Sequence, residues 1–365
     1  MNPLNAKRIL IVEVNWLGDC LFSTAFIRAV RNNFPRAYIA CMAVPRVKEI
    51  LDGNPHINEI IVYDVGGEHC SPLQTLRGNI NFVKQLKKYK FDTAFLLHRS
   101  FTRALMVYMA GITNRVGYRT FKCALLLTKP IEPEDISSEH RADFYLGVAR
   151  GAGLNVDAKG CDFFTSQADS EWAQNFLKEN SVSPGEKIIV FNPGGNWQPK
   201  RWPKDYFIEL GKLFLSDLSG NVKIMISGAA KDFQLAQEIG KGIGPDVIIM
   251  CGKANIKQSA ALFKKADLVI SNDSGPLHIA VSVGAKAIAL FGPTSSLITG
   301  PYQADSEKII VLEKNVGCNI PCYENSCADY RCMAAIKPEE VYEAALSLMT
   351  KSQIQNPNKS SNDKY

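Results

Sequence analysis

The sequence predicts an α/β protein with two doubly wound parallel sheets in tandem. Short β-branched runs alternate with amphipathic stretches nearly throughout, which is the pattern of βα units around parallel sheets. At about 100–200 residues per domain, 365 residues suggest two domains, each with its own core. The alternation restarts after a polar stretch that ends near Ser170. We therefore expect domains at 1–165 and 166–350, with a ligand cleft where the carboxyl ends of their strands face each other.

The expected elements follow this alternation in order. In the first half the strands are Ile9–Val14, Tyr38–Val44, Glu59–Tyr63 and Thr93–Leu97. The helices between and after them are Leu21–Asn33, Val47–Asp52, Leu73–Lys88 and a stretch from Arg103. A helix near Ala142–Arg150 then leads into the polar stretch, which is the candidate linker.

The second half repeats the pattern. Its expected strands are Lys187–Phe191, Val222–Ser227, Val247–Met250, Leu268–Ser271 and Ala287–Phe291. Its expected helices are Lys204–Leu218, Asp232–Ile243, Asn255–Lys265, Pro276–Val283 and Pro338 to about Met349. Residues 351–365 are polar and lack periodicity, so we expect a disordered tail.

Composition excludes several classes of protein. An apolar content of 46% with 21% charged residues matches ordinary globular usage, not disordered or collagen-like chains. The longest apolar runs, such as Ile9–Val14, are far shorter than the ~18 residues needed to span a bilayer. The first of these runs ends at Asn15, with no small-residue cleavage site of the kind that ends a signal peptide. We therefore expect a cytoplasmic protein without a membrane span.

The positive charge lies in one half of the chain. Residues 1–165 carry 21 Lys and Arg against 15 Asp and Glu, a net charge of +6, whereas residues 166–365 carry 21 of each. Such a field attracts phosphorylated ligands, nucleic acid or an acidic membrane surface. Because no basic run with interleaved aromatic residues resembles a nucleic-acid module, we do not expect nucleic acid to bind.

The turn after the first strand carries an acidic residue, Asp19, close to a helix start. Neither the G-x-G-x-x-G fingerprint nor a P-loop is present there, which argues against a dehydrogenase or a P-loop NTPase. Two interpretations of Asp19 stay open. It can act as a helix N-cap or first-turn acid, which stabilises by ~0.5–2 kcal/mol. It can also be a general base at the carboxyl end of the strand.

Two turns in the second half favour phosphate binding. In the first, Asn192 begins an Asn-Pro-Gly-Gly turn in which Gly194 and Gly195 can form an anion nest, and Lys200 follows with neutralising charge. The second turn, Ser271 to His278, joins a strand to a helix start, where a diphosphate can bind. A further turn, Phe291-Gly292-Pro293-Thr294, ends the next strand on the same rim. Together these loops indicate a nucleotide-diphosphate pocket.

Four cysteines stand within fifteen residues: Cys318, Cys322, Cys327 and Cys332. In a chain without an export signal, such a cluster suggests a structural metal before disulfides. The spacing is looser than the C-x2-C pairs of zinc ribbons and no His is adjacent. Reduced structural thiols, or disulfides formed on isolation, are the alternatives.

Taken together, these motifs resemble the ADP-heptose:lipopolysaccharide heptosyltransferases of glycosyltransferase family 9, and within that family the heptosyltransferase II members most closely. The resemblance spans roughly residues 7–350. The motifs that carry it are Trp16-Leu17-Gly18-Asp19, Ser100 to Leu105, Lys200-Arg201-Trp202-Pro203, Gly228 to Asp232, Asn272 to His278 and Leu290 to Thr294. It implies a GT-B fold, in which two Rossmann-like domains face each other across a cleft: an N-terminal acceptor domain and a C-terminal nucleotide-sugar domain.

The resemblance also implies an activity. A heptose would move from ADP-heptose to the inner core of lipopolysaccharide, heptosyl-Kdo2-lipid A, with inversion. Asp19 matches the catalytic aspartate, Lys200 a basic residue near the donor phosphates, and Asp273, Ser274, Gly275 and His278 the nucleotide-sugar box. Where some members have a glutamate against the ribose, this chain has Ala230, Lys231 and Asp232. No D-x-D pair is present, which fits a reaction that requires no metal cofactor.

The implied acceptor carries carboxylates and phosphates and is anchored in a membrane. We expect contacts to it from Gly18, Arg99, Arg103, Arg115, Arg119 and Lys122, although exposed cations are often merely solvated. Peripheral association with the anionic inner leaflet of the inner membrane follows from such an acceptor. Three other interpretations stay open: transfer of a different sugar, a nucleotide-sugar epimerase, and a non-catalytic nucleotide-sugar-binding protein.

Overall fold

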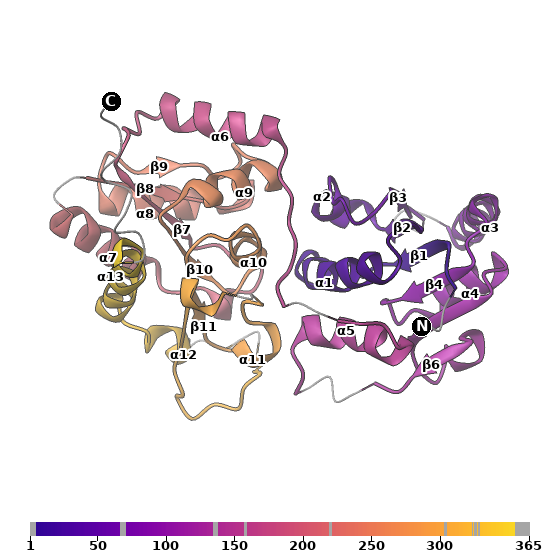
Figure 1. The fold of residues 1–365 in the computed structure, drawn as a ribbon. Helices are drawn as coiled ribbons and strands as arrows, with labels where there is room; N and C mark the ends of the chain where they lie inside the picture. Colours follow the sequence, from indigo (N-terminus) through magenta and orange to yellow (C-terminus); the bar gives the residue numbers. More distant parts are fainter. Residues whose placement is uncertain are drawn as a thin grey trace. The chain divides into compact units, whose positions relative to one another are not determined.

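The computed structural model describes residues 5–65, 71–133, 138–156, 159–218, 221–302, 305–322, 324, 327 and 329–354. The chain divides into two compact units, Met1–Phe164 and Thr165–Tyr365. Each unit is a parallel six-stranded sheet between two layers of helices (Figure 1). None of the helices in the described part of the chain has an apolar stretch long enough to cross a bilayer.

The sheet of the first unit has the strand order β3-β2-β1-β4-β5-β6. Its strands are β1 (Arg8–Val12), β2 (Tyr38–Ala43), β3 (Glu59–Val62), β4 (Thr93–Leu96), β5 (Asn114–Tyr118) and β6 (Lys129–Ile131). The central strands β1, β2 and β4 are almost wholly buried, as expected for continuous apolar runs covered on both faces. The chain moves outward from β1 to β3 and then adds β4 on the other side of β1. The topological switch point therefore lies between the carboxyl ends of β1 and β4.

Helices cover both faces of this sheet (Figure 1). The helices of the unit are α1 (Leu17–Asn33), α2 (Lys48–Leu51), α3 (Pro72–Tyr89), α4 (Phe101–Met109) and α5 (Arg141–Ala152), with the 3-10 helices η1 (Pro45–Val47) and η2 (Ala124–Leu126). Helix α1 packs against α5 and sets Phe26 edge-on against Phe95 of β4. Helices α3 and α4 cover the opposite face, which presents Leu10, Val12 and Leu96.

The second unit repeats this design with the strand order β12-β11-β10-β7-β8-β9. Its strands are β7 (Lys187–Asn192), β8 (Val222–Ile226), β9 (Ile248–Ile249), β10 (Leu268–Asn272), β11 (Ala287–Phe291) and β12 (Ile309–Glu313). The chain moves outward from β7 to β9 and then crosses to β10 on the other side of β7. Here the switch point lies between the carboxyl ends of β7 and β10.

Helices pack on both faces of the second sheet. The helices are α6 (Gln167–Glu179), α7 (Lys204–Asp217), α8 (Phe233–Ile243), α9 (Ile256–Lys265), α10 (Gly275–Ser282), α11 (Ser296–Thr299), α12 (Arg331–Ala334) and α13 (Pro338–Ile354), with the 3-10 helices η3 (Gln198–Lys200), η4 (Ala230–Asp232) and η5 (Ser306–Lys308). Helices α7, α8 and α13 pack on the face that presents Phe191 and Ile270. Helix α10 packs on the other face, against Phe291.

The predicted fold class is confirmed: the chain forms two doubly wound parallel sheets. Six strands and α-helices of the described residues were not predicted: β5, β6, β12, α6, α11 and α12. Strand β5 contains Asn, Arg and Gly, and β6 is a three-residue edge strand containing Pro130, so neither has a strong strand pattern. Helix α13 continues to Ile354, four residues into the stretch predicted to be disordered. The rest of that stretch lies outside the described residues.

Candidate functional site

Asp19 lies at the switch point of the first unit, in the first turn of α1. The N-cap of this helix is Trp16, so Asp19 is a first-turn acid and not the cap. The hydroxyl of Tyr145, on α5, donates a hydrogen bond of 3.0 Å to Oδ1 of Asp19. Burial and the neighbouring carboxylate raise the pKa of Tyr145 well above its usual range, so its hydroxyl remains a donor. Tyr145 thereby fixes the half-buried carboxylate of Asp19 through one of its two oxygens.

Arg103 supports this turn from the interior of the unit. Only 5% of Arg103 is exposed. Its Nη1 donates to the backbone oxygen of Glu13 at 2.5 Å, and its Nη2 donates to Oδ1 of Asn15 at 2.6 Å. A guanidinium can hold two acceptors in one fixed geometry, which a point charge cannot do. Arg103 therefore links the end of β1 to the turn that carries Asp19.

Glu13 is a buried acid beneath the same turn. The Ser23 hydroxyl donates to its Oε2 at 2.7 Å, and its Oε1 has no hydrogen-bond partner among the described residues. Burial raises the pKa of Glu13 to about 7, against the opposing effects of the Ser23 hydrogen bond and the Arg103 charge. Glu13 therefore keeps its proton to a higher pH than an ordinary glutamate does.

The other residues predicted to contact an acceptor lie at several positions in the first unit. A Cβ at position 18 would meet no atom within 4 Å, so the surface at Gly18 is open. Arg99 and Lys122 are exposed, and Arg119 pairs with Glu132 at the surface. Arg115 instead donates to the backbone oxygens of Ile112 and Leu126. The structure therefore brings Gly18, Asp19 and Arg103 together around one turn and places Arg115, Arg119 and Lys122 on β5 and the segment that follows it.

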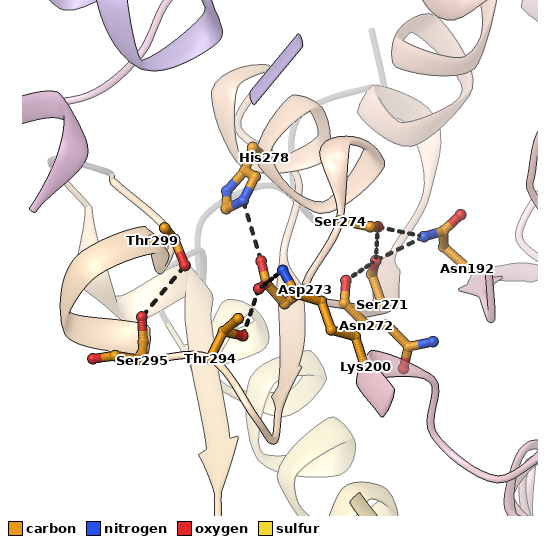
Figure 2. Close-up of polar contacts among 10 residues, drawn as sticks. All are labelled: Asn192, Lys200, Ser271, Asn272, Asp273, Ser274, His278, Thr294, Ser295 and Thr299. Atoms are coloured by element: carbon orange, nitrogen blue, oxygen red, sulfur yellow. Dashed lines mark hydrogen bonds and ion pairs between the residues drawn. The ribbon is translucent and has the colours of Figure 1, made fainter. Parts of the chain in front are cut away.

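In the second unit, an ion-pair cluster is centred on Asp273 (Figure 2). Lys200 Nζ lies 2.6 Å from Oδ2 of Asp273, and the Thr294 hydroxyl donates to the same oxygen at 2.6 Å. Nε2 of His278 lies 3.6 Å from the other oxygen. Burial by itself would raise the pKa of Asp273, but His278 and Lys200 outweigh it and lower the pKa to about 2. Asp273 is therefore ionised at neutral pH and fixes the Lys200 ammonium, whose side chain is 23% exposed.

A second set of hydrogen bonds joins the loops after β7 and β10. Nδ2 of Asn192 donates to Oγ of Ser271 at 3.0 Å and to Oγ of Ser274 at 2.9 Å (Figure 2). Nδ2 of Asn272 donates to the backbone oxygen of Pro193 at 2.9 Å. Asn192, Ser271 and Asn272 are buried at the carboxyl ends of β7 and β10. Their hydrogen bonds tie the two loops together at the switch point.

The start of α10 faces open space. Ser274 is the N-cap, but its side chain makes no capping hydrogen bond to the first turn. A Cβ at Gly275 would meet no atom within 4 Å. Pro276 has no N–H and the Leu277 N–H donates to the backbone oxygen of Ser274 at 3.1 Å, so the Gly275 N–H and the positive end of the helix dipole are the features that an anion can meet here.

The two glycines of the Asn-Pro-Gly-Gly turn have internal contacts that restrict their surroundings. A Cβ at position 194 would lie 2.9 Å from Oδ2 of Asp232, so a larger residue here would have to displace this carboxylate. The backbone oxygen of Gly195 accepts hydrogen bonds from Nε and Nη2 of Arg201. Packing thus explains part of a pattern that, from sequence, predicts an anion nest.

The described cysteines of the cluster give no support for a metal site. Within the part of the chain that the structure describes, no three His, Cys, Asp or Glu side chains are arranged to hold a metal ion. Cys318, Cys322, Cys327 and Cys332 are free thiols around a cavity of about 230 Å³ that Pro293 also lines. The suggested structural metal therefore has no support from these residues.

Thr294, Glu13 and Tyr145 are among the residues at the two switch points that were not predicted as site residues. Thr294 stands in the glycine turn after β11, so a signal for it was present in the sequence. Glu13 lies within an apolar strand end and looks like an ordinary strand residue. Tyr145 is 126 positions from Asp19 on another helix, and no local pattern joins the two.

Residues 80–328 match the model of glycosyltransferase family 9 (heptosyltransferase), so the chain belongs to this family and the protein is a glycosyltransferase. A lipooligosaccharide heptosyltransferase 2 of Campylobacter jejuni is 35% identical over 350 residues, which cover 94% of this chain and 99% of the relative.

Two solved structures share the fold. A family 9 glycosyltransferase from Veillonella parvula superposes with a TM-score of 0.83 at 24% identity, covering 96% of this chain and 99% of that one. The E. coli ADP-heptose lipopolysaccharide heptosyltransferase II has a TM-score of 0.77 at 23% identity, covering 95% and 99%. The tandem Rossmann-like units are thus those of the GT-B heptosyltransferase structures.

Proposed function

We propose that the protein transfers a heptose from ADP-heptose to heptosyl-Kdo2-lipid A, in the inner core of lipopolysaccharide, with inversion at the anomeric carbon. Family membership and the heptosyltransferase 2 relatives support the sugar and the class of acceptor. The observation that carries the proposal is Asp19, a half-buried carboxylate at a switch point, held by Tyr145 through one oxygen.

Asp19 acts as the general base. A sugar hydroxyl is too weak an acid to ionise first, so its proton must leave as the new glycosidic bond forms. Tyr145 occupies Oδ1 of Asp19, and Oδ2 receives the proton from the acceptor. General-base assistance of this kind contributes ~10²–10⁴-fold to rate. Arg103 is a positioning residue in this scheme, because it fixes the turn and touches no reacting atom.

The second unit holds the nucleotide diphosphate. The first turn of α10 and the Lys200 ammonium face the charge that grows on ADP as it departs. One preorganised donor at such a position is worth ~2.7–4 kcal/mol. Asp273 holds Lys200 in place, Asn192 and Ser274 fix the loops, and His278 orients Asp273. Gly194 and Gly195 shape the loop beside the site.

The proposal extends to conditions and location. Because the sequence has no D-x-D pair, we propose that transfer requires no divalent metal. Because the acceptor is lipid-anchored, we propose that the protein works at the cytoplasmic face of the inner membrane, on an anionic lipid surface. In this scheme the first unit is the acceptor domain and the second is the nucleotide-sugar domain.

The test is release of ADP from ADP-L-glycero-β-D-manno-heptose in EDTA, with and without heptosyl-Kdo2-lipid A. We expect release that depends on the acceptor, with mass spectrometry showing one heptose added to it. UDP-sugars serve as control donors. Release of free heptose without acceptor would indicate hydrolysis or epimerase-like chemistry instead. ADP binding without any turnover would indicate a different sugar or a non-catalytic binding protein.

A further inference from the structure

The segment between β5 and β6 presents two apolar side chains to solvent. Phe121 and Leu125 are 102% and 96% exposed relative to a free residue, the two largest values among the exposed large apolar residues described. Lys122, between them in sequence, is exposed as well. We call residues 121–125 the apolar tip. Single exposed apolar residues are ordinary, but two nearly complete exposures four positions apart call for an explanation.

The tip is anchored on its inner side. Cys123 and Leu127 are buried and belong to the core beneath α3 and α4. The Thr120 hydroxyl accepts a hydrogen bond from the Cys123 N–H at 3.2 Å, and Nε of Arg115 donates to the backbone oxygen of Leu126 at 2.5 Å. With one face fixed in this way, the backbone directs Phe121 and Leu125 outward. Their exposure is therefore built into the turn.

The charge around the tip is of one sign. Residues 115–129 contain four basic residues and no acidic one. The Arg115 guanidinium donates to the backbone oxygens of Leu126 and Ile112, and neither of these partners carries a negative charge. Arg119 pairs with Glu132 but remains more than half exposed, and Lys122 projects with the tip. Apolar side chains flanked by cations fit the boundary between anionic headgroups and acyl chains.

We propose that the apolar tip docks the protein on an anionic lipid bilayer, with Phe121 and Leu125 inserted at the headgroup boundary and Lys122 on lipid phosphate. This rests on the proposed function in one respect: a lipid-anchored acceptor requires the first unit to work at a bilayer. The 121–125 segment then supplies a contact that no catalytic residue provides.

The first test is co-sedimentation with vesicles of phosphatidylcholine mixed with phosphatidylglycerol. The double variant Phe121→Ser, Leu125→Ser should bind about tenfold more weakly or worse, because each buried apolar side chain contributes strongly to partition. Leu297→Ser is the matched control, since Leu297 is 80% exposed in the second unit. Lys122→Gln should weaken binding to mixed vesicles by about fivefold and leave binding to phosphatidylcholine vesicles unchanged. Equal vesicle binding by wild type and the double variant would overturn the proposal.

The second test separates docking from transfer. With an acceptor stripped of its acyl chains, the double variant should turn over at the wild-type rate, whereas with acceptor in vesicles it should be slow. A loss of rate on the stripped acceptor would place the tip in substrate binding and overturn the proposal. A change in oligomeric state by light scattering would do so too, because a second copy would then cover the tip. Tip-dependent vesicle binding without any heptose transfer would support docking and refute the proposed function.

Discussion

The two units share one sheet topology, but the side chains at their switch points are arranged differently. In the second unit, the polar side chains bind one another: Lys200 and Thr294 both contact one oxygen of Asp273, and Asn192 joins two loops. In the first unit, Asp19 receives a single hydrogen bond from Tyr145, above a buried support made by Arg103 and Glu13. A cluster whose side chains hold one another in place is suited to binding a charged ligand. A carboxylate that Tyr145 contacts through one oxygen is suited to accepting a proton on the other. The loops after the strands, not the sheets, make this difference.

Asp19→Asn should have the largest effect on rate. Because the amide cannot accept the acceptor proton, kcat should fall by ~10²–10⁴-fold, while Asn can still accept the Tyr145 hydrogen bond. Steady-state ADP release with acceptor measures this. Glu339→Gln, which also removes a first-turn helix carboxylate, is the control and should leave kcat unchanged. Turnover of Asp19→Asn near the wild-type rate would mean that another group is the base.

Lys200→Met should lower kcat/KM by ~10²–10³-fold, because the departing ADP loses a preorganised cation. The variant also leaves Asp273 without its ammonium partner, so the folded fraction must be checked by circular dichroism. Lys200→Arg keeps the ion pair and should recover part of the rate. If Lys200→Met is folded and fully active, the diphosphate does not depend on this cluster.

Glu13→Gln should change the pH dependence of stability. Between pH 4.5, the ordinary pKa of Glu, and about 7, the folded protein keeps a proton on Glu13 that the unfolded chain has released. This group's contribution to the free energy of unfolding therefore falls as pH rises through that window, by about 3 kcal/mol in total. Urea unfolding at several pH values should show wild type losing stability relative to Glu13→Gln. Glu132→Gln, which changes an exposed glutamate paired with Arg119, is the control and should show no such trend. If the stability curves of wild type and Glu13→Gln ran parallel across this pH range, Glu13 would not be a buried acid with a raised pKa.

Arg103→Lys should lower kcat about tenfold, because an ammonium cannot hold both the Glu13 oxygen and the Asn15 side chain. If Arg103 only positions the turn, the KM for ADP-heptose should stay the same. Arg31→Lys disturbs another guanidinium bound to backbone oxygens, those of His56 and Ala37, and is the control. A raised KM with unchanged kcat would instead place Arg103 in substrate binding.

Tyr145→Phe should have the smallest effect, about two- to tenfold in kcat, the worth of one hydrogen bond to Asp19. Tyr118→Phe is the control. It removes a hydroxyl on β5 that donates to the backbone oxygen of Phe144, which lies next to Tyr145 on α5. The two variants should differ in rate although both lose one tyrosine hydroxyl. Identical rates would show that the Asp19 contact does not matter for catalysis.

The sequence predicted more of the second site than of the first. Lys200, Asp273 and His278 stand in two local motifs at strand ends, and parallel strands bring such ends together at one sheet edge. In the first unit only Asp19 is marked by its local pattern. Arg103 looked like a cation for an acceptor, but its burial and its contacts with β1 depend on how α4 packs. Tyr145 and the buried acid Glu13 depend in the same way on tertiary packing, which residue spacing does not encode.

The central claim is that the first unit performs the chemistry and the second holds the nucleotide. The most direct test is the affinity for ADP of Asp19→Asn and Lys200→Met, measured by calorimetry under identical conditions. We expect wild-type affinity for Asp19→Asn and about 10- to 100-fold weaker binding for Lys200→Met, which is the worth of a hydrogen bond to a charged group. Weakened ADP binding in Asp19→Asn, with wild-type binding in Lys200→Met, would contradict it.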